Sequence, residues 1–197
     1  CREAYEKGRA NGKFIVFPTA IGYDRLSTIV GPENLLPALL DNPDWVSDMA
    51  GTWADLYIQC ADAVLAHDID FDAAFLYDDL GYRDRPFFSN EIYREVFMPH
   101  HRKLCDFFHD RGKKVILHSC GYVAPLVPDF IGAGFDCLQP IEVKAGMNLL
   151  ALKEEYGNEL ALMGGIDVRA MSASREKLEA EVHKICRAKV GGGYIYH

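Results

Sequence analysis

The sequence has no long hydrophobic run, no cluster of basic residues and no low-complexity segment. No apolar stretch approaches the roughly 20 residues that cross a membrane as a helix, so we expect no transmembrane segment. The chain has 21 basic residues against 29 acidic ones, and its formal net charge is −8. Because the basic residues are scattered, binding to nucleic acid or to an anionic membrane surface is not expected.

The cysteines also lack the regular spacing of a disulfide scaffold. Six of them are scattered along the chain, at positions 1, 60, 105, 120, 137 and 186. This pattern fits a reducing, cytoplasmic compartment best. The chain opens with neither Met nor a signal peptide, and residues 193–196 resemble a strand with little after it. We therefore interpret the sequence as a fragment of a longer protein.

Short apolar runs alternate with segments of helical periodicity along the chain. The apolar runs predict six buried strands, at 14–17, 73–77, 114–118, 135–139, 160–163 and 193–196. Helices are predicted at 1–11, 43–66, 89–111, 123–132, 148–156 and 174–189. We expect Pro99 to kink or split the third of these helices, and we expect a long loop with Gly22, Gly31 and Pro32 after the first strand.

This alternation predicts an α/β fold built from right-handed βαβ units around a parallel sheet. Strands that are apolar throughout are typical of a sheet buried on both faces. Six βα units are too few for a complete (β/α)₈ TIM barrel but suit most of one. No linker or change in composition divides the chain, so we expect residues 1–197 to form a single domain, a partial barrel.

The most informative stretch is Val-Ile-Leu-His-Ser-Cys-Gly at 115–121, in which an apolar run typical of a buried strand is followed by His, Ser and Cys. Side chains alternate along a strand, so His118 and Cys120 point to the same side and can bind one soft metal ion such as zinc. Gly121 lets the backbone turn away. A zinc site needs at least one more ligand, and the candidates are Glu142, Asp79 or a residue beyond the chain end. The competing interpretation is that both residues only pack in the core.

Other polar residues follow the remaining predicted strands. They are Asp78 and Asp79, then Gln139 and Glu142, then Gly164, Gly165 and Asp167, and finally Tyr196 and His197. In a parallel barrel all of these positions converge on one mouth, where catalysis takes place. Of the adjacent aspartates we expect one to face inward and the other to face a loop, although Asp before Gly is also ordinary turn chemistry. We expect His100, His101, His109 and His183 on helix surfaces and assign them no role.

Several short motifs occur in a recognisable order. They are Tyr-Asp-Asp-Leu-Gly at 77–81, Phe-Ser to Phe-Met-Pro across 88–99, His-Ser-Cys-Gly at 118–121, Phe-Asp-Cys-Leu-Gln-Pro at 135–140 and Met-Gly-Gly-Ile-Asp at 163–167. Together they resemble the uroporphyrinogen decarboxylase superfamily, over roughly residues 14–197 and only the latter part of a full member. The superfamily also contains zinc-dependent, corrinoid-linked methyltransferases. The resemblance implies a (β/α)₈ barrel, in agreement with the strand and helix pattern.

The His-x-Cys pattern is similar to the methyltransferase branch, in which His, Cys and a later Cys bind zinc. The resemblance implies that His118 and Cys120 bind zinc, which activates a substrate thiol to accept a methyl group from a methylcorrinoid carried by a partner protein. No later Cys is present up to residue 197, so Glu142 or another oxygen ligand would have to replace it. Asp78 or Asp79 would then act in the catalytic cavity. Its other substrate-binding residues would be Gln139, Gly164, Gly165, Asp167 and Tyr196.

Two alternatives remain open from the sequence. One is the decarboxylation of uroporphyrinogen in porphyrin metabolism, which needs no metal but calls for a basic cavity. The other is a non-catalytic barrel that binds a corrinoid or a partner protein. The missing third zinc ligand motivates this alternative. Because six strands cannot close an eight-stranded barrel, we also expect the open edges to pair with another chain, for example in a homodimer.

Overall fold

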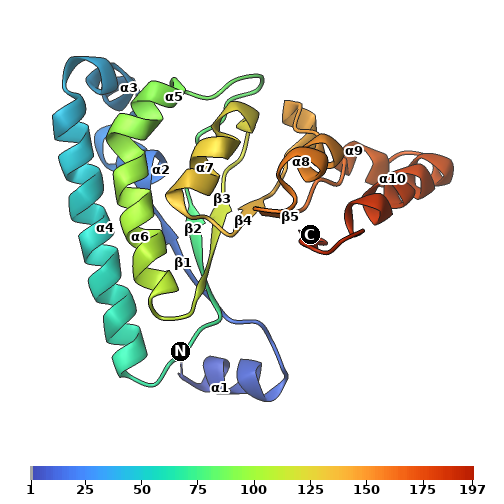
Figure 1. Ribbon diagram of the computed structural model, residues 1–197, viewed down its shortest axis with the longest axis horizontal. Helices are drawn as coiled ribbons and strands as arrows, with labels where there is room; N and C mark the ends of the chain where they lie inside the picture. The colour runs from blue at the N-terminus through green and yellow to red at the C-terminus, as the bar shows by residue number, and fades with distance from the viewer. Residues whose placement is uncertain (1) are drawn as a thin grey trace.

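Six parallel strands form one sheet in the computed structural model, which describes residues 2–197; Cys1 lies outside the described residues (Figure 1). The strands are β1 (Val16–Ala20), β2 (Ala73–Tyr77), β3 (Lys114–His118), β4 (Cys137–Gln139), β5 (Ala161–Met163) and β6 (Tyr194–Ile195). Their order in the sheet follows the order in the chain, and every neighbouring pair is parallel. This is the α/β fold of a partial (β/α)₈ barrel, as predicted.

One helix precedes the first strand, and further helices connect each strand to the next. They are α1 (Arg2–Ala10), α2 (Gly22–Val30), α3 (Pro32–Asp41), α4 (Pro43–Ala66), α5 (Asn90–Ile92), the π-helix η1 (Tyr93–Phe97), α6 (Met98–His109), η2 (Ala124–Leu126), α7 (Val127–Ala133), η3 (Val143–Ala145), α8 (Leu149–Tyr156), α9 (Val168–Met171) and α10 (Arg175–Ala188). The long helices α4 and α6 run side by side along the sheet, whereas α10 projects at the far end (Figure 1). Within residues 2–197 no helix combines the length and the apolar character needed to cross a membrane.

The two faces of the sheet pack against different surroundings. Alternate residues of β2 and β3, such as Leu76 and Leu117, face the helices and belong to the main core. The intervening residues, such as Ala73 and Ile116, form a separate cluster on the inner side of the curved sheet. Because side chains alternate along a strand, His118 continues the inner row of β3, which directs it to the inner side where the strands end.

Several predicted elements match the structure to the residue, and one prediction is wrong. Strands 73–77 and 114–118 and helix 43–66 have the predicted bounds. The segment predicted as a long loop instead contains α2 and α3, which bury Leu26, Leu35 and Leu39. The glycine and proline that suggested a loop mark the helix boundaries, since Gly31 ends α2 and Pro32 begins α3, where a missing N–H costs nothing.

Two prolines account for two further differences, and the bounds of β4, β5 and β6 differ from the predicted ones by one or two residues. The first strand begins and ends later than predicted and includes Pro18, which is tolerated because β1 is an edge strand. Pro99 lies in the first turn of α6, directly after the five-residue π-helix. The helix predicted at 89–111 is therefore split, as expected, into α5, η1 and α6.

Candidate functional site

Hydrogen bonds connect successive residues of the loop after β2 to successive residues of the loop after β3. The backbone N–H of Asp78 donates to the His118 carbonyl (2.9 Å), and the N–H of Leu80 donates to Ser119 Oγ (3.0 Å). The N–H of Cys120 donates in turn to Asp79 Oδ1 (2.8 Å). These bonds hold the polar residues of the two strand ends in one fixed arrangement.

Two glycines let these loops approach each other closely. Gly121 has a φ of +82°, and a Cβ placed there would lie 2.3 Å from the carbonyl carbon of Gly81. A Cβ on Gly81 would lie 2.6 Å from the carbonyl oxygen of Cys120. The backbones are therefore closer than any side chain would allow, which explains glycine at both positions.

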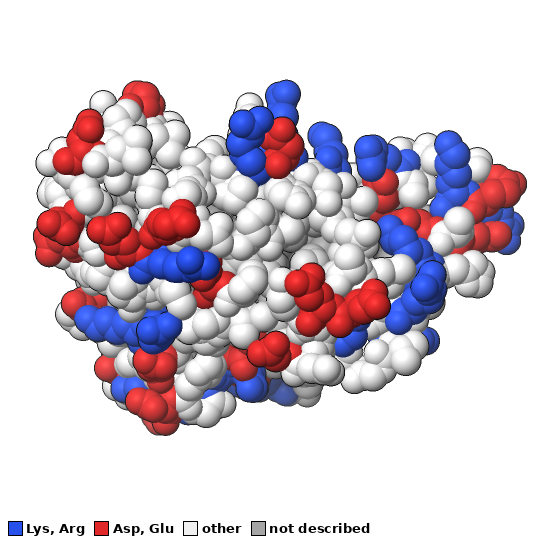
Figure 2. All heavy atoms as spheres, turned by 45° about the horizontal axis from the view of Figure 1, so that its top comes forward, with Lys and Arg blue, Asp and Glu red and all other residues white. Residues whose placement is uncertain are grey.

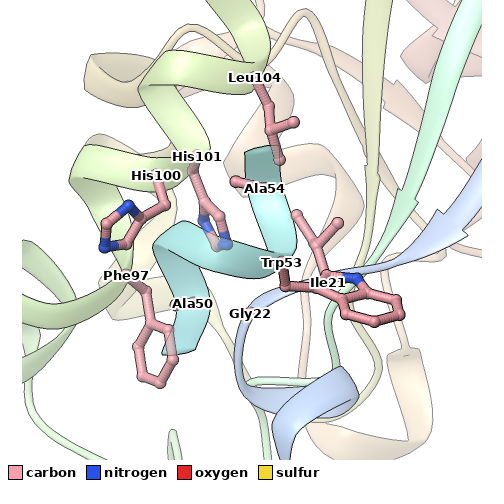
Figure 3. Close-up of a pocket in the computed structure, with 9 residues that line it drawn as sticks. All are labelled: Ile21, Gly22, Ala50, Trp53, Ala54, Phe97, His100, His101 and Leu104. Atoms are coloured by element: carbon pink, nitrogen blue, oxygen red, sulfur yellow. The ribbon is translucent and has the colours of Figure 1, made fainter. Parts of the chain in front are cut away.

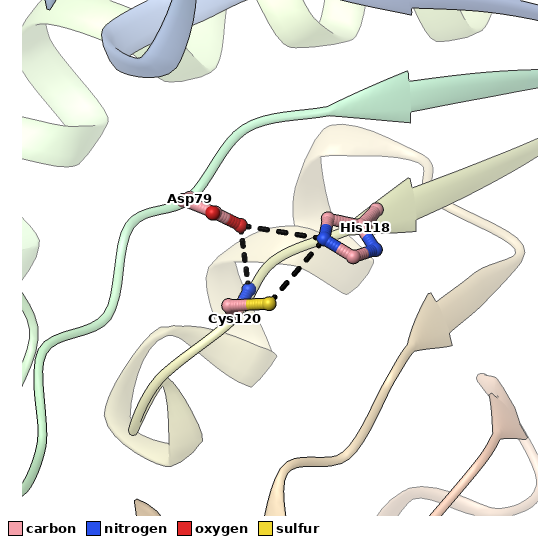
Figure 4. A group of neighbouring side chains, drawn as sticks. All are labelled: Asp79, His118 and Cys120. Atoms are coloured by element: carbon pink, nitrogen blue, oxygen red, sulfur yellow. Dashed lines mark hydrogen bonds and ion pairs between the residues drawn. The ribbon is translucent and has the colours of Figure 1, made fainter.

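Asp79, His118 and Cys120 come together at this junction (Figure 4). One ligand atom from each lies within 4.8 Å of the others. His118 Nε2 is 3.4 Å from Cys120 Sγ and 3.5 Å from Asp79 Oδ1. All three residues are partly exposed, so the cluster is open to solvent. A nitrogen, a sulfur and an oxygen donor at this spacing fit a zinc ion that keeps a fourth position free for a substrate.

The His118 ring is held from its other side. Its Nδ1 is hydrogen-bonded to Oε1 of the buried Gln139, and Gln139 Nε2 lies 3.1 Å from His197 Nδ1. An amide oxygen accepts, so Nδ1 carries the proton and Nε2 presents its lone pair toward Asp79 and Cys120. A bond of this kind orients metal-binding histidines in proteins. Gln139, expected as a substrate-binding residue, thus lies behind His118.

The surroundings of Cys120 are strongly acidic. Burial, followed by the negative charges of Asp79 and Glu142, raises the pKa of the Cys120 thiol to about 12. Burial, followed by the charges of Asp78 and Asp79, also raises the pKa of Asp24, a residue of α2 that no sequence motif singles out. Asp24 adds further to the negative field at Cys120. A bound divalent cation would offset this charge and favour the thiolate.

Glu142 stands beside the cluster rather than in it. Its Oε2 accepts a hydrogen bond from the N–H of Gly121 (2.8 Å). It separates two hollows of about 540 Å³ and about 520 Å³. The first is lined by Gly81, Tyr82, Arg83, Cys120, Gly121, Glu142, Lys144 and Ala145. The second is more apolar and includes Ile141, Val143, Gly164, Gly165, Ile166 and His197. Of the predicted substrate-binding residues, Gly164 and Gly165 therefore lie in a hollow at the mouth.

The adjacent aspartates diverge, as expected for neighbours on extended backbone, but Asp78 packs against helices rather than facing a loop. Asp79 faces the cluster, whereas Asp78 is fully buried on the helix side of the sheet, where its Oδ1 accepts from the Asp24 N–H (2.8 Å). Burial raises the pKa of Asp78, and the neighbouring His101 opposes this effect. Asp78 therefore has no open path to a substrate at the mouth.

The structure does not bring Asp167 and Tyr196 to the cluster. The Asp167 carboxylate caps α9 and pairs with Arg169 (2.8 Å), which lowers the pKa of Asp167 to about 2. It lines a different hollow, between α9 and α10. Tyr196 is 55% exposed, and its hydroxyl lies near Cys186. Both residues follow their strands as predicted, but their side chains turn away from the mouth.

His101 is a buried residue that the sequence reasoning missed. It was expected on a helix surface, but its exposed fraction is 1%, and its Nε2 lies 3.1 Å from Asp78 Oδ2. Its spacing to Leu104, Cys105 and Phe108, all buried, follows the i, i+3, i+4, i+7 pattern of an inward helix face. This spacing is the feature of the sequence that indicates a buried position for His101. Two of the other histidines also make specific contacts, His100 with Ser47 and His109 with Asp136, while His183 is exposed.

Comparisons with known proteins agree with this fold. A family model described as uroporphyrinogen decarboxylase (URO-D) matches residues 23–197. Among solved structures, the chain is similar to a methyltransferase from Methanosarcina mazei, with a TM-score of 0.74 and 19% sequence identity. The match covers 93% of this chain and 52% of that one, so the chain spans about half the length of the methyltransferase. No match was found among curated proteins.

Proposed function

Because the chain belongs to the uroporphyrinogen decarboxylase family, we propose that it carries the zinc site of an enzyme that transfers a methyl group from a methylcorrinoid to a thiol. The observation that carries this proposal is the convergence of Asp79, His118 and Cys120 within 4.8 Å. A site with donors of this type fits zinc and leaves one coordination position open for a substrate sulfur.

Each residue of the cluster has a defined part in the proposal. His118 Nε2, Cys120 Sγ and a carboxylate oxygen of Asp79 would hold the metal, so that Asp79 supplies the third ligand. Gln139 orients the His118 ring, and the Cys120 N–H orients Asp79. When bound, the metal supplies a positive charge that favours the ionised form of a substrate thiol, the nucleophilic form.

The hollow beside Cys120 suits the binding of the thiol substrate in such a reaction. The hollow beside Cys120 gives a thiol access to the cluster, and the basic groups of Arg83 and Lys144 line it. We propose that the methylcorrinoid is presented by a separate protein at the same mouth. A reducing, cytoplasmic setting is part of the proposal, because the five cysteines among residues 2–197 are all free.

Zinc analysis tests this proposal. Under reducing conditions the protein is expected to bind one zinc per chain, and Cys120→Ala and Asp79→Ala are each expected to abolish stoichiometric binding. Cys186→Ala is the matched control, because Cys186 is a partly exposed thiol on α10 outside the cluster. Absence of zinc from the reconstituted protein, or equal loss in the control, would contradict the proposal.

Decarboxylation of uroporphyrinogen is the second candidate within the same family. Arg83 and Lys144 favour it, since a substrate with many carboxylates needs positive charge in its cavity. Asp24, Asp79 and Glu142 oppose it, because they concentrate negative charge at the same place. Activity on uroporphyrinogen that persists in the presence of a chelator would favour this candidate over methyl transfer.

A further inference from the structure

A buried pair of side chains lies behind the cluster, on the helix side of the sheet. Asp78 at the end of β2 and His101 of α6 have exposed fractions of 0% and 1%. Asp78 Oδ2 and His101 Nε2 form an ion-pair contact of 3.1 Å, and within residues 2–197 neither atom makes a hydrogen bond. The narrow space beside His101, which Gly22 and Ala50 also line, has no room for a water molecule (Figure 3). The two groups therefore depend on each other, since a buried polar atom without a partner is costly.

Two contacts besides the one with Asp78 fix the orientation of the His101 ring. Nδ1 lies 2.9 Å from the hydroxyl of Tyr93, a fully buried residue of the π-helix η1. The ring also packs edge-on against Phe135, with centroids 5.6 Å apart. His101 thus presents Nε2 to Asp78 in one orientation only.

The start of α2 is shaped around the same carboxylate. Gly22 has a φ of +48°, and a Cβ there would lie 2.1 Å from Asp78 Oδ2 and 2.8 Å from His101 Nε2. The N–H of Asp24 donates to the other carboxylate oxygen of Asp78. Segments from β2, α2 and α6 therefore meet at the Asp78 carboxylate, and any side chain at position 22 would break this contact.

Asp78 connects this buried pair to the cluster. It is the residue directly before Asp79, and its own N–H donates to the carbonyl of His118. With its side chain held by His101 and by the Asp24 N–H, the peptide between residues 78 and 79 has little freedom to rotate. That peptide decides where the Asp79 carboxylate points.

We infer that His101 is a positioning residue: through Asp78 it fixes the end of β2, so that Asp79 stays within reach of His118 and Cys120. The inference rests on the proposed zinc site and adds to it a residue from α6 that never touches the metal. Substitution of a group that orients a metal ligand typically lowers metal affinity by 10- to 100-fold.

Two amide substitutions separate positioning from general stability. His101→Gln places an amide near the position of Nε2 and keeps the contact with Asp78, whereas His101→Asn places its amide near Nδ1, toward Tyr93, and loses that contact. We expect zinc affinity, measured by competition with a chelator, to fall at least about tenfold in His101→Asn and to stay within about threefold of wild type in His101→Gln. Cobalt(II) spectra should change in the Asn variant alone.

The neighbouring histidine provides a control. His100 lies on the same helix but pairs with Ser47 of α4, so His100→Asn should leave zinc affinity unchanged. Asp78→Asn keeps the shape of the carboxylate and removes its charge, so it should lower zinc affinity as His101→Asn does. This second variant keeps the inference testable if His101→Asn folds poorly. Equal affinities in His101→Asn and His101→Gln, or unchanged affinity in Asp78→Asn, would overturn the inference.

A measurement on the metal-free protein separates this inference from the proposed function. The Cys120 N–H is bonded to Asp79 Oδ1, so its hydrogen-exchange rate reports whether Asp79 is in place. We expect faster exchange at Cys120 in His101→Asn than in His101→Gln. If wild type binds no zinc but this difference is present, the proposed function fails and the positioning role stands. Equal exchange in the two variants overturns the positioning role alone.

Discussion

Position decides what each thiol of this protein can do. Burial raises the pKa of both Cys120 and Cys137 to about 12, so neither is ionised to any extent at neutral pH in the metal-free protein. Cys137 is the first residue of β4 and packs against Ile116. Cys120 lies beside His118 Nε2 and opens to a hollow. The same chemical group is therefore part of the core in one place and a candidate ligand in the other.

The Asp79→Asn substitution tests the electrostatics of Cys120. The negative charge of Asp79 helps to raise the pKa of Cys120, so removing that charge should lower the pKa. At a fixed pH below the pKa, each unit by which the pKa falls gives about ten times more thiolate. We expect metal-free Asp79→Asn to alkylate at Cys120 faster than wild type between pH 8 and 9, with a pH profile shifted to lower pH. Peptide mass spectrometry after timed alkylation measures this. The rate at Cys186 serves as the internal reference, and an unchanged or slower rate at Cys120 would count against the effect.

Among the elements, the two loops after β2 and β3 form one rigid unit. Three hydrogen bonds link residues 78–80 to residues 118–120, and the backbones of Gly81 and Gly121 are in direct contact. The zinc proposal depends on this unit, because a metal site needs ligands whose positions are set before the metal binds.

Two glycine substitutions isolate the effect of this contact. Gly121→Ala forces a Cβ against the Gly81 backbone, whereas Gly112→Ala introduces a Cβ with nothing within 4 Å. Both glycines have positive φ, +82° and +67°, so both variants carry a left-handed strain of about 1–2 kcal/mol. We expect Gly121→Ala to lower the free energy of unfolding by at least about 1 kcal/mol more than Gly112→Ala and to weaken zinc binding. Urea unfolding and zinc titration provide the measurement, and equal destabilisation would show that the loops move apart at no cost.

At the scale of the whole molecule, the sheet has two free edges. Within residues 2–197, β1 and β6 each pair with one strand only, and apolar side chains next to them are exposed, including Phe14 (64%) and Tyr196 (55%). Further apolar side chains of α9, Val168 and Met171, are also exposed. On the face shown in Figure 2 the charged side chains lie mainly around the periphery, and the middle is largely uncharged. Little charge repulsion therefore opposes contact between copies over that region.

We predict that the 197-residue chain associates with itself through these edges. Unpaired strand edges and exposed apolar surface both favour association. Light scattering over a range of concentrations should show a mass above 22.1 kDa, the mass of one chain, that rises with concentration. Charged substitutions at Phe14 and Tyr196 should reduce the association. A monodisperse monomer at high concentration would rule the prediction out.

The sequence by itself determined the parts of this protein that depend on local periodicity. Strands 73–77 and 114–118 follow from the alternation of side chains, which needs no tertiary information. The same alternation places Cys120, two residues after the end of β3, beside His118. Likewise Asn148 and Ser174 cap α8 and α10 because a capping side chain acts on its own helix.

Only the tertiary structure decided which distant residues meet. It brings Asp79 rather than Glu142 or Asp78 to the cluster, and it buries His101 against Asp78. It also turns the expected loop before residue 43 into α2 and α3, whose leucines pack on the helix side of the sheet. The physical reason is that these outcomes depend on contacts between segments more than 20 residues apart. Their free energy comes from packing and from hydrogen bonds that local sequence does not encode.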